Sequence, residues 1–142
     1  MGSYVNLDHT ADLAIQVKAE DISDLIRTAA DAWRDIVFEN QTIVPLEQER
    51  IEIKGETAEE ILVECLSEFN YLSQIKGKIF HSYEQLTVSE SKKQLNLKAV
   101  INVDRFDVKR HQTVVEIKAV TFHQLDIQKV NKHLQTVIVF DI

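Results

Sequence analysis

Cysteine, proline and glycine are scarce in this chain, and each scarcity excludes a class of protein. The 142 residues include one cysteine, one proline and three glycines. Cys65 alone leaves no intrachain disulfide, which fits a reducing compartment. Three glycines are too few for a glycine-rich phosphate loop, a G-x-S-x-G elbow or a dinucleotide fingerprint in their usual forms. A self-sufficient nucleotide enzyme is therefore disfavoured, and so is a linker-rich or disordered architecture.

Positive charge and aromatic residues are also in short supply. The chain has 16 Lys and Arg against 23 Asp and Glu, a formal net charge of −7, and only 7% aromatic residues. Because affinity for nucleic acid comes largely from cations that neutralise phosphates, we expect no direct binding of RNA or DNA. An acidic surface instead favours encounter with a basic protein partner.

The rest of the composition is that of an ordinary globular protein. Hydrophobic residues make up 44% and charged residues 27%, so we expect one domain over residues 1–142. No apolar run approaches the roughly 20 residues that span a bilayer, and no basic leader precedes an apolar stretch, so we expect a cytoplasmic protein with no membrane partner. Gly2-Ser3 has the composition of a cloning scar, and residues 1–3 are left out of the interpretation.

Two segments have the spacing of amphipathic helices. The first follows Asp21 or Ser23 as its N-cap and ends near Phe38. The second begins at Thr57-Ala58-Glu59-Glu60, a capping box in which Thr57 accepts from an early helical N–H and Glu60 reaches back to the cap. The apolar positions of the first are Leu25, Ile26, Ala29, Ala30, Trp33, Ile36 and Val37, and those of the second are Ile61, Leu62, Cys65, Leu66, Phe69, Leu72 and Ile75.

Cys65 lies within the apolar positions of the second helix, which Gly77 is expected to end. No basic residue adjacent to Cys65 is present to lower the pKa of its thiol. We therefore expect this cysteine to be a small buried hydrophobic residue and not a nucleophile.

Alternating apolar residues predict strands in the rest of the chain. A polar stretch over 89–94 predicts a hairpin turn, and residues 128–132 read as a polar connection before the last strand. The fold class is therefore α+β, with two amphipathic helices packed on one mostly antiparallel or mixed sheet. The alternating residues are Leu13, Ile15 and Val17; Ile51 and Ile53; Leu86 and Val88; Leu95, Leu97, Ala99, Ile101 and Val103; Val115, Ile117 and Ala119; and Leu134, Thr136, Ile138 and Phe140.

Acidic residues stand beside the first and last of these predicted strands. His9-Thr10-Ala11-Asp12 precedes the first, and Phe140-Asp141-Ile142 closes the last. A strand that reaches Ile142 holds its main-chain carboxylate one residue beyond the Asp141 side chain, and these oxygens make a hard-cation site if Asp12 joins them. The alternative is that each aspartate is an ordinary strand-end residue that binds water or a backbone N–H.

Together with Glu116-Ile117-Lys118-Ala119-Val120-Thr121-Phe122-His123, these motifs resemble the archease family. Archeases are small proteins that activate the RNA-splicing ligase that joins tRNA exon halves. The resemblance extends over nearly the whole chain in the order, spacing and total length of the motifs. It implies a non-catalytic accessory protein that promotes guanylylation and multiple turnover of the tRNA-splicing RNA ligase, and that meets RNA only through that ligase.

The resemblance also implies a divalent-cation site formed by the two ends of the chain. Its ligands would be Asp12, Asp141 and the Ile142 carboxylate. Oxygen-only ligands favour Ca²⁺, which we expect in crystals, with Mg²⁺ or Mn²⁺ as alternatives. The residues expected to support the site or to face the partner are His9 and Thr10, which would orient Asp12, together with Lys118 and His123.

Other readings of these residues stay open. Lys118 is equally a solvated charge on an outer strand face, and His9, His111 and His123 are each more typical of imidazoles that bond a carbonyl or carboxylate. No HxxxH or HxH pair occurs, so a zinc site is weakly indicated. Two further functional hypotheses remain: a small metal-dependent phosphoester hydrolase that uses Asp12 and Asp141, and a general protein-binding or chaperone-like domain.

Overall fold

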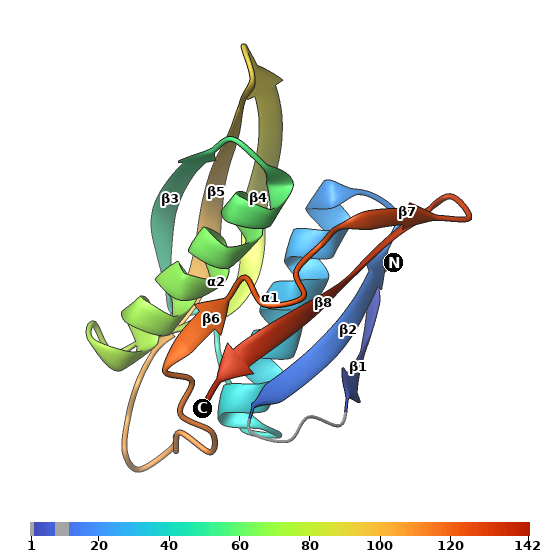
Figure 1. The fold of residues 1–142 in the computed structure, drawn as a ribbon. Helices are drawn as coiled ribbons and strands as arrows, with labels where there is room; N and C mark the ends of the chain where they lie inside the picture. Colours follow the sequence, from blue (N-terminus) through green and yellow to red (C-terminus); the bar gives the residue numbers. More distant parts are fainter. Residues whose placement is uncertain (1, 8–11) are drawn as a thin grey trace.

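A computed structural model describes residues 2–7 and 12–142 of the chain. It contains two long helices, α1 (Ile22–Phe38) and α2 (Ala58–Gln74). The strands are β1 (Ser3–Leu7), β2 (Leu13–Ala19), β3 (Glu47–Gly55), β4 (Lys78–Ser91), β5 (Gln94–Arg105), β6 (Ala119–Thr121), β7 (Gln128–Val130) and β8 (His133–Asp141). The α+β class predicted from the sequence is confirmed (Figure 1).

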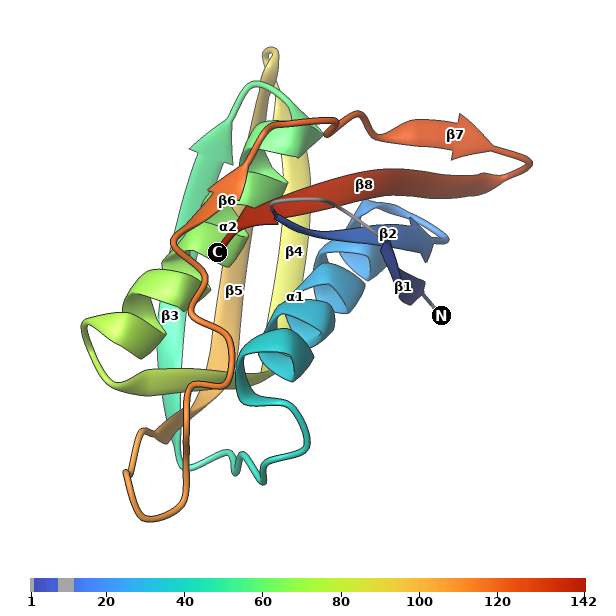
Figure 2. The same ribbon diagram turned by 60° about the horizontal axis from the view of Figure 1, so that its bottom comes forward.

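The strands form two antiparallel sheets, where the sequence predicted one sheet. The larger sheet has the order β1-β2-β8-β6, with β7 also paired to β8, and the smaller has the order β3-β5-β4. Each helix packs against strands of both sheets, as the two views together show (Figure 2). The pairing of distant segments, such as β2 with β8, brings the first and last parts of the chain together.

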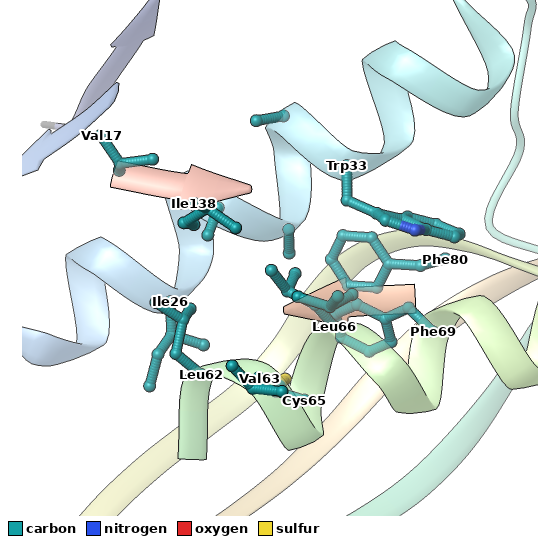
Figure 3. Close-up of a cluster of buried hydrophobic side chains, with 14 of the residues drawn as sticks. Val17, Ile26, Trp33, Leu62, Val63, Cys65, Leu66, Phe69, Phe80 and Ile138 are labelled. Carbon is teal, nitrogen blue, oxygen red and sulfur yellow. The ribbon is translucent and has the colours of Figure 1, made fainter. Parts of the chain in front are cut away.

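The two sheets and the two helices share one hydrophobic core. Trp33 of α1, Phe69 of α2 and Phe80 of β4 are fully buried at its centre (Figure 3). The rings of Phe69 and Phe80 are stacked with centroids 4.3 Å apart, and Trp33 lies 6.1 Å from Phe69. Burial of a large apolar side chain contributes roughly 1.5–3 kcal/mol, so these aromatic residues join the layers.

Both helices begin as the sequence predicts. The Asp21 side chain accepts from Asp24 N, and the Thr57 hydroxyl accepts from Glu60 N. One detail of the capping box is wrong: the Glu60 carboxylate accepts from the backbone N of Glu56, not of Thr57, at 2.8 Å. The reciprocal bond therefore satisfies a donor one residue earlier than expected.

Two strand predictions also need correction. Residues 115–118 are not a strand, because the ladder with β8 starts only at Ala119. Residues 128–130 are strand β7 and form a hairpin with β8, where a polar connection was expected. Ser3 begins β1, and the Gly2 amide donates to Asp24 at 3.0 Å, so both residues contact the fold, whereas their origin as a cloning scar stays a prediction.

Candidate site at the converging strand ends

The pairing register brings three of the predicted site residues to one end of the larger sheet. Leu13 of β2 pairs with Phe140 of β8, so Asp12 and Asp141 are the next residues outward on these two strands. On the other side of β8, Ala119 of β6 pairs with Asp141. The start of β2, the end of β8 and the start of β6 therefore meet where Asp12, Asp141 and Lys118 stand, next to the chain's C-terminus (Figure 1).

Strand alternation sets the accessibility of Asp141. Phe140 is fully buried in the core, and the residue after it faces the opposite side of the sheet. Asp141 is accordingly exposed, and Ile142 is 42% exposed. Oxygens at this position remain in contact with water, so a cation held there would not carry the cost of burying an uncompensated charge.

The backbone beside Lys118 is held by α2. The Lys118 N–H donates to the Asp141 carbonyl at 2.7 Å. The preceding carbonyl, that of Ile117, accepts from the side-chain amides of Asn70 at 2.8 Å and Gln74 at 2.9 Å. These amides lie four residues apart on one side of α2. They bond the backbone in place of a strand ladder and so fix the position of Lys118.

Sequence reasoning did not assign a role to Asn70 or Gln74. Asn70 is buried and also accepts from the Trp33 indole N–H at 3.4 Å. The available signal was an amide directly after Phe69, in a helix whose neighbouring positions are apolar. An amide buried among such residues is expected to have a hydrogen-bond partner. Its partner was not visible, since Ile117 is 47 residues away.

Of the predicted supporting residues, His123 lies away from Lys118. His123 follows β6 at the end opposite to Lys118, and its backbone N donates to the Thr121 hydroxyl at 3.3 Å. Because Thr121 pairs with Val139 and not with Asp141, the strand carries His123 away from the converging ends. His9 and Thr10 lie outside the described residues.

The donor chemistry of the converging ends fits a hard cation. Asp12 and Asp141 supply carboxylate oxygens, and Ile142 carries main-chain oxygens beside them, which is the ligand type that Ca²⁺, Mg²⁺ and Mn²⁺ prefer. Within residues 2–7 and 12–142, no three His, Cys, Asp or Glu side chains form a group that could hold a metal ion. The predicted ligand set has two such side chains, so it stays a prediction.

A second carboxylate cluster lies at the end of β5 and is buried. The Asp104 side chain has no exposed area and accepts from the backbone N of Val44 at 3.0 Å and from Arg110 at 3.1 Å. Burial disfavours its charge, but hydrogen bonds from Val44, Arg110 and Arg105 outweigh this and lower its pKa below the ordinary value.

His111 completes this buried cluster. Its Nε2 lies 3.2 Å from the Thr42 carbonyl oxygen and 3.2 Å from Asp104 Oδ2, and its Nδ1 accepts from the Asp107 backbone N–H at 3.1 Å. The expectation that His111 bonds a carbonyl or a carboxylate is confirmed. Both ring nitrogens are engaged, so His111 joins the segments around residues 42, 104 and 107.

Cys65 is buried, as predicted. Its Sγ lies 3.0 Å from the Tyr83 hydroxyl, and burial raises the pKa of the thiol to about 12. A thiol with this pKa is almost entirely protonated at neutral pH, which excludes it as a nucleophile.

In the described part of the chain, no helix is long and apolar enough to cross a bilayer.

Comparisons with known proteins agree with this architecture. The model of the archease protein family (MTH1598/TM1083) matches residues 4–142. Protein archease of Methanopyrus kandleri is 31% identical over 128 residues, 89% of each chain, and that of Methanosarcina barkeri is 29% identical over 139 residues, 98% of this chain and 95% of its relative.

Two solved structures share the fold. Protein 1598 of Methanobacterium thermoautotrophicum has a TM-score of 0.83 at 22% identity and covers 98% of both chains. A Thermotoga maritima protein, described as an archease and possible chaperone, has a TM-score of 0.55 at 24% identity and covers 96% of this chain and 94% of its own. At these identities, the likeness establishes the fold alone.

Proposed function

The chain belongs to the archease family, and from this premise we propose that it is a non-catalytic accessory protein that activates a tRNA-splicing RNA ligase. It promotes guanylylation of the ligase and its multiple turnover, and it meets RNA only through the ligase. The cytoplasm is the compartment in which we expect both proteins.

The observation that supports this function is the convergence of three strands at one exposed end of the larger sheet. The pairs Leu13 with Phe140 and Ala119 with Asp141 bring the backbone positions of Asp12, Asp141 and Lys118 to one end of the sheet, and α2 holds the carbonyl just before Lys118. Opposite charges at a solvent-facing edge suit contact with a partner's nucleotide or phosphates.

Each residue has a distinct part in the proposal. Asp12, Asp141 and Ile142 hold a divalent cation, Ca²⁺ in crystals and Mg²⁺ or Mn²⁺ as alternatives. When bound, the cation supplies positive charge that stabilises nucleotide phosphates. The Lys118 ammonium, exposed at the same end, meets a phosphate or bridges carboxylates. The residues His9, Thr10 and His123 keep their predicted supporting or partner-facing roles.

The test is single-turnover guanylylation of the cognate RNA ligase with GTP and divalent metal, with and without this protein. Wild-type protein is expected to accelerate guanylylation, and Asp141→Ala, Asp12→Ala and an extension after Ile142 are expected to abolish the acceleration. Asp126→Ala is the matched control. Asp126 is an exposed aspartate whose backbone N–H donates to Thr136 of β8, away from Asp141. Circular dichroism of each variant checks the fold.

Other outcomes would support the remaining hypotheses. Full stimulation by all three site variants would exclude the strand ends as the functional site. Turnover of a phosphoester without any ligase, lost in Asp12→Ala, would identify a metal-dependent hydrolase. Binding of unfolded clients that ignores both the aspartate variants and chelation would identify a chaperone-like domain.

A further inference from the structure

The solvent-facing side of α2 has two chemically different halves. Glu60, Glu64, Glu68, Tyr71 and Ile75 follow one another at intervals of three or four residues, so they lie on one side of the helix. We call these five residues the α2 stripe. The first three are acidic and the last two are apolar, so one helix face presents negative charge and then apolar surface.

The acidic half borders a hollow of about 490 Å³. Its lining includes Glu60, Glu64 and Glu68 of α2, Ile53 of β3, and Phe122, which is 55% exposed. Glu52 and Lys54 of β3 complete the lining, and Glu52 is paired with Lys98 at 3.8 Å. Among the described residues, no intramolecular ion pair includes Glu64 or Glu68.

The apolar half borders a second hollow of about 310 Å³, lined by Tyr71, Ile75, Lys118 and Ala119 among others. Tyr71 is 45% exposed and Ile75 is 68% exposed. Large apolar side chains that gather at the surface beside polar groups mark interaction sites. With Phe122, three such side chains lie along α2 and the segment that contains β6.

We propose that the α2 stripe is the docking surface for a basic protein surface, namely that of the RNA ligase; this inference rests on the proposed function. Uncompensated glutamates in a chain of net charge −7 attract a cationic surface, which steers association. The same charge repels RNA, so the occupant is protein. Tyr71 and Ile75 supply the apolar contacts that hold the complex, because aromatic and aliphatic anchors carry much of the binding energy of interfaces.

The position of the stripe connects docking to the strand-end site. Lys118 lines the apolar hollow, and its backbone N–H bonds the Asp141 carbonyl. A partner seated on Tyr71 and Ile75 therefore lies beside Lys118, whose backbone is bonded to that of Asp141. Docking and activation use neighbouring but separate residues, which makes them separable by mutation.

The experiment measures the affinity of this protein for the cognate RNA ligase by biolayer interferometry at low and physiological salt. Glu64→Lys/Glu68→Lys is expected to weaken binding about tenfold or more at low salt and to reduce its salt dependence. Glu39→Lys/Glu90→Lys is the matched control, because it changes the net charge equally at exposed sites away from α2. Tyr71→Ala/Ile75→Ala is expected to weaken binding at both salt concentrations.

Equal binding by Glu64→Lys/Glu68→Lys and its control would overturn the docking surface while wild-type stimulation still stands. Glu64→Gln/Glu68→Gln repeats the test without new positive charge, in case the lysine variant misfolds. Wild-type protein that neither binds nor stimulates the ligase would overturn both the proposed function and this inference. A dimer of this chain that dissociates in Glu64→Lys/Glu68→Lys would assign the stripe to self-association and overturn the proposal.

Discussion

Two carboxylates close two strands of this protein, and their surroundings differ in almost every respect. Asp104 is the penultimate residue of β5 and has no exposed area, whereas Asp141 is the last residue of β8 and is exposed. Asp104 accepts from backbone and side-chain donors that outweigh the cost of burying its charge. A buried carboxylate that accepts hydrogen bonds from the protein itself stabilises the fold. A carboxylate that faces water remains available for a cation or a partner.

The largest expected difference between the two carboxylates is in stability. Asp104→Ala leaves the Val44 amide without its partner and removes one partner of His111, and loss of such hydrogen-bond partners costs about 1–3 kcal/mol. Asp141→Ala should change the free energy of unfolding by about 0.5 kcal/mol or less, as at other exposed sites. Urea unfolding followed by circular dichroism measures both. Similar losses of unfolding free energy in the two variants would contradict the expected difference between the buried and the exposed carboxylate.

A smaller effect is expected from divalent cations. At ten times its Kd, a bound cation raises the free energy of unfolding by about 1.4 kcal/mol, and we expect this rise with Ca²⁺ in wild-type protein and in Asp126→Ala. Asp141→Ala should lose it, whereas disruption of the buried cluster by His111→Gln should keep it. Thermal unfolding with Ca²⁺ and with chelator measures the shift. A full shift in Asp141→Ala would place the cation elsewhere.

The smallest effect is expected from acid. The pKa of Asp104 in the folded protein is lowered below its unfolded value of about 3.9. The stability that ionised Asp104 contributes is therefore present above about pH 4 and is lost as the pH falls through the lower folded value. Asp104→Asn should flatten this acid-side decline, measured as unfolding free energy between pH 5 and about pH 2.5. An unchanged slope in the variant would assign the decline to other carboxylates.

Local sequence signals predicted both helices well. The 3–4 spacing of apolar residues and the caps at Asp21 and Thr57 act within a few residues, so they can be read directly from the sequence, and each cap bond is present. Cys65 was also predicted correctly, because its place among apolar helix residues determines its burial.

The two wrong strand predictions concern a segment that distant side chains hold and a hairpin that turns without glycine. Val115, Ile117 and Ala119 alternate like a strand, yet the chain before Ala119 is held by side chains of Asn70 and Gln74 and not by a ladder. The hairpin of β7 and β8 turns at Asn131 and Lys132, which have φ of 52° and 81° without any glycine to signal it. Side-chain bonds between distant segments leave no local pattern in the sequence. Turns without glycine leave none either.

The sequence by itself determined the helices, most strands, the α+β class and the family to which the chain belongs, because these depend on periodicity, caps and motif order. Only the tertiary structure decided that the strands divide into two sheets and that β2, β6 and β8 align so that Asp12, Lys118 and Asp141 stand at one end. It also decided which strand-end aspartate is buried. Register and burial follow from packing between residues far apart in the chain, and no local pattern specifies such packing.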